Sequence, residues 1–157
     1  MSQWETRLQA LHLTLPELPE KKGTYLLYRR AGDLIFVSGQ SAFLGDQALY
    51  PGRVGAEVTR EQGREAAFET GRLILSILQE ASGDLDRVEI LKVTGYVASA
   101  PDFYDQSWVL NGLSDLFIHV LGERGKHARA AIATNHLALD CCVEVETIAR
   151  VIPPSEQ

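Results

Sequence analysis

The chain has 157 residues, of which 45% are hydrophobic and 23% are charged. This length and composition suit one globular domain with its own core, and they exclude a disordered chain. Fifteen Lys and Arg against 21 Asp and Glu give a formal net charge of −6, the opposite of the basic balance that favours nucleic acid. We therefore expect a single domain over residues 1–157, and the charge disfavours a nucleic-acid partner.

Membrane insertion, export and disulfide bonding also lack support in the sequence. The longest apolar runs, such as 73–78, are far shorter than the roughly 18 residues of a membrane span. The N-terminus lacks the basic start and apolar core of a signal peptide. Cys141 and Cys142 are adjacent, so we expect small apolar fillers without a stabilising disulfide between them. These features predict a cytoplasmic protein without a membrane partner.

The predicted elements alternate strands with few helices. Helical spacing of apolar residues, β-branched and aromatic runs, and turn residues define their limits. In chain order they are a short helix over 4–13, hairpin strands over 24–28 and 34–39, a candidate short strand over 47–50, a helix over 59–83, a strand over 88–98, a helix over 101–122, and strands over 130–135 and 143–151.

The helix over 59–83 has the clearest limits. Thr59 and Gln62 form a capping box, in which each side chain satisfies a backbone N–H of the other residue. Apolar residues follow at spacings of three and four, and Gly83 is placed to end the helix.

This element order predicts an α+β fold in which two main helices cover one face of a β-sheet. The other face still carries alternating apolar residues, and such a face is rarely left open to water. We therefore expect an oligomer, with small-molecule sites where subunits meet.

The common chemical motifs are absent from the sequence. It has no Gly-rich phosphate loop, CxxC, HExxH or GxSxG motif. The histidines lack ligand spacing and are expected at surfaces or interfaces: His12, His119, His127 and His136. We expect no metal and no cofactor.

Two segments near the C-terminus carry the most specific pattern in the chain. His127-Ala128-Arg129-Ala130-Ala131-Ile132 precedes Cys142-Val143-Glu144-Val145-Glu146-Thr147-Ile148-Ala149. With Tyr25, Val37-Ser38-Gly39-Gln40 and Asn111-Gly112, these segments resemble the Rid family, also called YjgF or L-PSP endoribonuclease, over residues 24–152. Further segments resemble the longer, less characterised members of that family. Residues 1–23 form an N-terminal extension to this core.

The resemblance implies a chorismate-mutase-like fold and a homotrimer with clefts between its subunits. In the deaminase members, the arginine that matches Arg129 binds the carboxylate of an enamine or imine acid, and the glutamate that matches Glu144 orients or activates water. The products are a 2-keto acid and ammonium. A guanidinium fork suits a planar carboxylate, and a charge-assisted hydrogen bond of this kind is worth roughly 1.5–3 kcal/mol.

Four further residues match positions that line the family's cleft. They are Tyr25, Gly39, Asn111 and Ala131, and the Ala131 carbonyl matches a backbone group that helps to hold the water. A structural role is the alternative for each; for Gly39 it is a β-bulge. The implied partner is a small metabolite with a carboxylate.

Other interpretations of the same residues remain open at this stage. Arg129 and Glu144 are 15 residues apart, which fits two neighbouring strands that reach one cleft, or a salt bridge at a subunit interface. Lys126 and His127 are expected in a solvated turn. The alternative functions are a trimer that binds a carboxylate metabolite without turnover and, less favoured by the charge of −6, an endoribonuclease or translation inhibitor.

Overall fold

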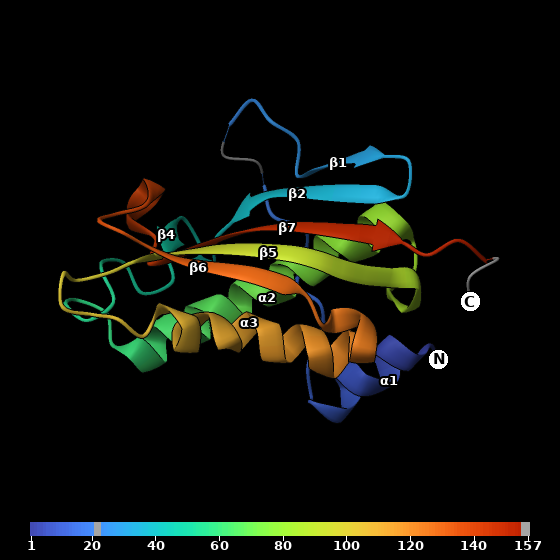
Figure 1. Ribbon diagram of the computed structural model, residues 1–157, viewed down its shortest axis with the longest axis horizontal. Coiled ribbons are helices and arrows are strands. Elements are labelled where there is room, and N and C mark those ends of the chain that lie inside the picture. The colour runs from blue at the N-terminus through green and yellow to red at the C-terminus, as the bar shows by residue number, and fades with distance from the viewer. Residues whose placement is uncertain (21–22, 155–157) are drawn as a thin grey trace.

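The computed structural model describes residues 1–20 and 23–154 (Figure 1). The helices and strands are α1 (Gln3–Ala10), β1 (Tyr28–Ala31), β2 (Leu34–Gln40), β3 (Phe43–Leu44), β4 (Gln47–Ala48), α2 (Arg60–Ser82), β5 (Val88–Ala98), α3 (Gln106–Leu121), β6 (Ala128–Thr134) and β7 (Val143–Val151). Three short 3-10 helices complete the described chain: η1 (Leu85–Arg87), η2 (Gly122–Gly125) and η3 (Ala138–Asp140). Within these described residues, no helix combines the length and hydropathy that a membrane crossing requires.

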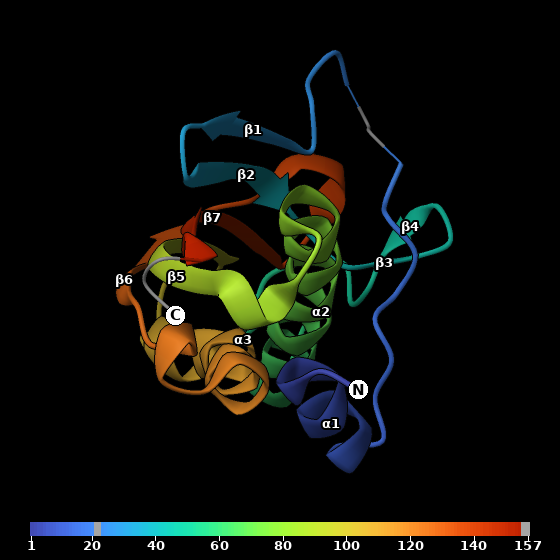
Figure 2. The ribbon, with the colours of Figure 1, turned by 90° about the vertical axis from the view of Figure 1, so that its right-hand side faces the viewer.

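Five strands form one mixed sheet in the order β1-β2-β7-β5-β6. β5 and β6 are parallel, and the other neighbouring pairs are antiparallel. The long helices α2 and α3 lie on one side of this sheet (Figures 1 and 2). The short helix α1 lies next to them, on the side that faces away from the sheet. The predicted α+β fold is confirmed.

The limits of α2 follow from its capping residues. The Thr59 hydroxyl accepts a hydrogen bond from the Gln62 backbone N–H, and the Gln62 side chain accepts one from the Thr59 N–H. At the other end Gly83 has a φ of 76°, which a residue with a side chain adopts at a cost. The predicted start and end of this helix are therefore correct.

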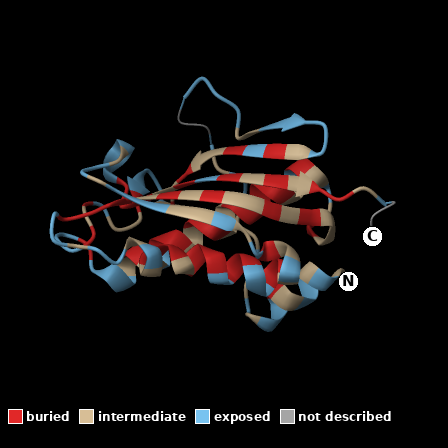
Figure 3. Cartoon of the chain, in the orientation of Figure 1, coloured by how far each residue is buried: buried red, intermediate tan, exposed pale blue. Residues whose placement is uncertain are grey.

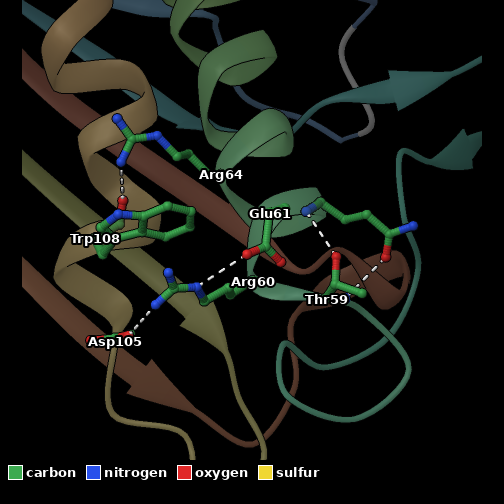
Figure 4. A network of polar contacts seen from close by, with 7 residues as sticks. Thr59, Arg60, Glu61, Arg64, Asp105 and Trp108 are labelled. Atoms are coloured by element: carbon green, nitrogen blue, oxygen red, sulfur yellow. Dashed lines mark hydrogen bonds and ion pairs between the residues drawn. The ribbon is translucent and has the colours of Figure 1, made fainter.

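A network of arginines joins the starts of α2 and α3 (Figure 4). Arg60 forms an ion pair with Asp105 at 2.8 Å, and Arg64 donates to the Trp108 carbonyl at 3.0 Å. Both guanidinium groups stack over the Trp108 ring, 4.2 and 4.7 Å from its centre. These contacts fix the first turn of α3 against α2.

The opposite face of the sheet is only partly buried. Exposure alternates along β2 and β7, as expected when one face packs on helices and the other does not (Figure 3). Phe36 and Ile132 on this open face are 42% and 40% exposed, although both are large and apolar. Within the described chain, no helix covers these side chains.

The first strand lies later in the chain than predicted. Residues 24–27 precede the strand, which runs over Tyr28–Ala31. The reason is the irregular register of β2 near Ser38, whose N–H bonds the Leu27 carbonyl and whose hydroxyl bonds the Leu26 carbonyl. Residues 24–27 are thus held at the edge of the sheet without continuing the ladder.

Both predicted helices outside α2 are shorter than the apolar spacing suggested. α3 begins at Gln106, because the Phe103 N–H closes a turn on the Ala100 carbonyl and the Gln106 side chain bonds the Phe103 carbonyl. α1 ends at Ala10, and His12 has a positive φ of 55°. Apolar spacing shows which residues share a face, but local turns decide where a helix begins and ends.

The N-terminal segment packs along α2. The Asp86 carboxylate accepts hydrogen bonds from the first backbone N–H groups of α1, at 2.8 and 2.9 Å. Further on, Arg72 donates to the Thr14 carbonyl and Ser76 to the Pro16 carbonyl. These bonds bring residues 14–20 beside the strand edge where Tyr25 lies.

Candidate functional site

The residues predicted for the site separate into two groups in the fold. One group surrounds Arg129, between β6 and α3. The other lines a cavity beside the end of β2 and the start of β7.

The Arg129 guanidinium is held entirely by neutral oxygens. Nη1 donates to Asn111 Oδ1 at 3.0 Å and to Ser114 Oγ at 2.9 Å. Nη2 donates to the Ser107 hydroxyl at 2.8 Å and to the Ser107 carbonyl at 3.2 Å. No carboxylate of the described residues lies within ion-pair distance of the Arg129 guanidinium. Its position is fixed, but its charge is not neutralised by direct contact.

Partial burial acts on the same group. It lowers the pKa of Arg129, while the charge of Asp115 raises it. An arginine remains protonated throughout the physiological range despite such shifts. The site therefore presents a permanent, oriented cation.

Three α3 residues supply these oxygens from one helix face. Ser107, Asn111 and Ser114 follow one another at i, i+4 and i+7, the spacing that places side chains along one stripe. The prediction included Asn111 but missed both serines. The spacing was visible in the sequence, yet nothing there showed that this stripe faces Arg129.

His127 also lies behind Arg129, and its expected place in a solvated turn is wrong. Its Nε2 is 2.9 Å from Ser114 Oγ, and its Nδ1 is 2.6 Å from the Gly125 carbonyl oxygen. The ring packs edge-on against Phe117. Lys126, in contrast, is exposed and forms an ion pair with Glu123, as a solvated turn predicts.

The second group lines a cavity of about 950 Å³. Tyr25, Gly39 and Glu144 contribute to its wall, together with apolar side chains of Leu27, Phe43 and other residues. Tyr25 stands in the loop before β1 and is 45% exposed. Sequence reasoning missed that Pro19 and Glu20 of the N-terminal segment complete this wall.

Gly39 leaves the space that the Glu144 side chain occupies. A Cβ atom at residue 39 would lie 2.2 Å from Glu144 Oε1. The β2 register also shifts between Val37 and Gln40, so this glycine sits at a bulge as well as at the cavity wall. Burial, followed by the charge of Glu146, raises the pKa of Glu144. The carboxyl group is thereby suited to exchange protons closer to neutral pH than an ordinary glutamate.

Arg129 and Glu144 do not meet within one chain. The expectation that their strands are neighbours is wrong, because β5 lies between β6 and β7. Arg129 pairs with Val93 and Glu144 with Tyr96, three residues further along β5. Side chains three residues apart on a strand point to opposite faces, so the two groups face different sides of the sheet.

The remaining predicted residues carry less chemistry of their own. Ala131 lies on the edge strand β6 beside Gly95 and is exposed. Cys141 and Cys142 are buried and unbonded to each other. Burial raises the pKa of both thiols, for Cys142 to about 12, which agrees with their predicted role as small fillers. Over residues 1–20 and 23–154, no three His, Cys, Asp or Glu side chains gather as a metal site would require.

Sequence and structure comparisons agree on one family. Residues 5–150 match the family model described as "YjgF/chorismate mutase-like, putative endoribonuclease". Protein TCP17 of Trypanosoma cruzi is 36% identical over 146 residues, which cover 92% of this chain and 91% of that protein.

Solved structures extend this agreement to the fold. A protein of unknown function from Agrobacterium tumefaciens is 35% identical, with a TM-score of 0.85 over 95% of this chain and 92% of its own. A structure titled as a putative endoribonuclease from Shewanella oneidensis is 29% identical, with a TM-score of 0.90 over 96% of this chain and 100% of its own. RidA from a Psychrobacter species, at 24% identity and a TM-score of 0.59 over 86% of this chain and 94% of its own, shares the fold. The chain belongs to the YjgF/chorismate mutase-like family, which also bears the names Rid and L-PSP.

Proposed function

We propose that the protein hydrolyses reactive 2-imino or 2-enamino acids to 2-keto acids and ammonium, without a cofactor, in clefts between the subunits of a homotrimer. One observation carries this proposal: Arg129 is fixed by four hydrogen bonds from its Nη atoms to neutral oxygens and has no carboxylate in contact. A fixed cation without a counter-ion is the arrangement that recognises an anion. The substrate carboxylate is the anion that it would bind.

The cavity around Glu144 supplies the second part of the reaction. Water must add to the C=N carbon, and the nitrogen must gain protons before it leaves as ammonia or ammonium. A carboxyl group with a raised pKa can accept a proton from the attacking water and return it to the departing nitrogen. An enamine first takes a proton at C3 to become the imine, and the same hydrolysis follows.

The placement of the two groups supports a cleft shared between subunits. Arg129 and Glu144 face opposite sides of the sheet in one chain, so a second copy must supply the missing partner for each. The open sheet face offers a surface for this assembly, because Phe36, Tyr96, Ile132 and Ile148 form half-exposed cross-strand neighbours there. In the proposed trimer, Arg129, Asn111 and Ala131 of one subunit face Tyr25, Gly39 and Glu144 of the next.

The proposed reaction requires only modest catalysis from the site. Imines of this kind already hydrolyse in water, so orientation of the carboxylate and of one water molecule is sufficient help. No strong nucleophile is required, which fits the buried thiols of Cys141 and Cys142.

The test is 2-keto acid release from freshly generated 2-aminoacrylate and from bulkier imino acids. We expect the wild type to accelerate release and Arg129→Ala to abolish the acceleration while remaining a trimer. Arg129→Lys should retain only a minor part, because an ammonium group lacks the planar fork. Arg53→Ala, which removes a surface arginine paired with Glu57, is the matched control and should behave as wild type.

Two other outcomes decide against the proposal. If the wild type equals buffer for every substrate but binds pyruvate through Arg129, the protein is a ligand-binding trimer without turnover. If the purified protein instead cleaves RNA and the cleavage weakens steeply with salt, the endoribonuclease name of its relatives applies to it, despite the net charge of −6.

A further inference from the structure

A continuous chain of hydrogen bonds runs behind Arg129. It starts at the Gly125 carbonyl, passes through both ring nitrogens of His127 and the Ser114 hydroxyl, and ends at Arg129 Nη1. The three contacts measure 2.6, 2.9 and 2.9 Å. His127 itself does not contact Arg129 and takes no part in the proposed hydrolysis.

The two ends of this chain determine the direction of every bond in it. A carbonyl oxygen only accepts, so His127 Nδ1 carries a hydrogen and donates to Gly125. A guanidinium only donates, so Ser114 Oγ accepts from Arg129. The Ser114 hydroxyl then has its own hydrogen to donate, and the lone pair of a neutral His127 Nε2 receives it. Each group thus has one role, provided that the imidazole is neutral.

The surroundings favour the neutral imidazole. Burial, followed by the charge of Arg129, lowers the pKa of His127, although the bond to Gly125 acts in the opposite direction. Phe117 of α3 covers the ring and brings no charge. Among the other charged groups of α3 and η2, Asp115 pairs with Arg64 and Glu123 with Lys126. Arg124 of η2 donates to the Asp86 carbonyl, and His119 of α3 is exposed.

Protonation of His127 would break this order. Nε2–H and Arg129 would then both donate to Ser114 Oγ, whose own hydrogen would lose its acceptor. Two positive groups would also meet at one oxygen. The hold of Ser114 on the guanidinium would therefore weaken, and Asn111 and Ser107 alone would define its orientation.

We propose that His127 is a positioning residue that, through the Ser114 hydroxyl, holds Arg129 in the orientation that binds the substrate carboxylate. We call the hydrogen-bonded chain Gly125–His127–Ser114–Arg129 the relay. This inference rests on the proposed function, because the relay acts on the arginine that binds the substrate carboxylate. It predicts that affinity for a carboxylate depends on the protonation state of a histidine that never touches the ligand.

The probe is pyruvate, the product expected from 2-aminoacrylate, and the measurement is its dissociation constant between pH 5 and 8 by calorimetry. His127→Phe and Ser114→Ala should weaken binding on the order of tenfold at pH 7.5, since each removes the oriented acceptor behind Arg129. His127→Gln keeps an acceptor near the Nε2 position but cannot titrate. It should therefore bind within about twofold of wild type at pH 7.5 and lack the weakening at acid pH that we expect of the wild type. His119→Gln, which replaces an exposed histidine of α3, is the control and should change neither quantity.

An NMR titration reads the relay without any ligand. The His127 ring signals, assigned by their loss in His127→Gln, should show the Nδ1–H tautomer and a midpoint below 6.5, the ordinary value for histidine. In Arg129→Ala the midpoint should rise, because the neighbouring positive charge is gone.

The outcomes separate the two proposals. If wild type binds pyruvate through Arg129 but His127→Phe and Ser114→Ala bind it equally well, the relay is wrong and the site stands. If His127→Gln keeps the same acid weakening as wild type, the relay is also wrong. If wild type neither binds pyruvate nor hydrolyses imines, the proposed function is wrong. The relay then has no role in carboxylate binding, even when the titration shows the expected tautomer.

Discussion

Replacing Gly39 by alanine tests the contact between β2 and the Glu144 carboxyl. The φ of Gly39 lies outside the left-handed region, so alanine fits the backbone there. Its Cβ, however, would lie 2.2 Å from Glu144 Oε1, whereas ordinary contact begins at 3.4 Å. The carboxyl oxygen must therefore withdraw by about 1.2 Å.

The stability and the activity of this variant should respond differently. Moving the Glu144 side chain about 30° from its rotamer should lower the stability by about 0.5–1.5 kcal/mol. Alanine should raise the stability by about 0.4–1 kcal/mol, because it restricts the conformations of the unfolded chain. The free energy of unfolding should thus stay within about 1 kcal/mol of wild type. A misplacement of about 1 Å in a reacting group can reduce the rate roughly 100-fold. We expect a folded protein with a large loss of kcat in the imine hydrolysis assay.

A double-mutant cycle with Glu144→Gln identifies the cause. If Gly39→Ala acts by moving the carboxyl group, it should have little further effect once Glu144 is an amide. Wild-type kcat in Gly39→Ala, or equal and additive losses in both backgrounds, would refute the reasoning. A loss of several kcal/mol in stability would also refute it, because the backbone would then be strained.

Three further predictions concern packing, pH and thiol reactivity. Gly112→Ala should destabilise the fold by about 1–3 kcal/mol in urea denaturation, since its Cβ would lie 2.3 Å from the Arg64 carbonyl oxygen; an unchanged midpoint would contradict this close helix approach. Glu144→Gln should stabilise the protein at pH 7 but not at pH 4. The raised pKa of Glu144 means that the native state binds more protons than the unfolded state, so this carboxyl group lowers the stability as pH rises. A gain in stability that is equal at both pH values would contradict the pKa shift. Cys141 and Cys142 should react with a thiol reagent far more slowly in the native than in the denatured protein at pH 8, and equal rates would show that these buried thiols are accessible.

The sequence already contained the elements that depend on local interactions. The Thr59 capping box and Gly83 define α2 to the residue, because caps act within one turn of the chain. The strands over 88–98 and 143–151 were also predicted with the limits that they have. The family could be named from short motifs for a similar reason, since each motif is contiguous in the chain.

The order of the strands could not be obtained in this way. β6 and β7 follow each other in sequence, yet β5 comes between them, so the turn after β6 does not join neighbouring strands. Strand order depends on contacts between residues distant in sequence, and no local pattern records which strand inserts where. With β5 between their strands, Arg129 and Glu144 lie on opposite faces of the sheet. They therefore belong to two separate groups of residues in one chain, and not to the single cleft that the sequence suggested.

Side-chain partners were decided by the tertiary structure as well. Ser107, Ser114 and His127 are ordinary polar residues in the sequence, and only the packing of α3 on β6 aligns their hydrogen bonds with Arg129. The sequence determined which residue types and local elements were available, because those follow from interactions along the chain. The tertiary structure decided which of them meet, because hydrogen bonds and burial depend on positions that only the packed sheet and helices fix.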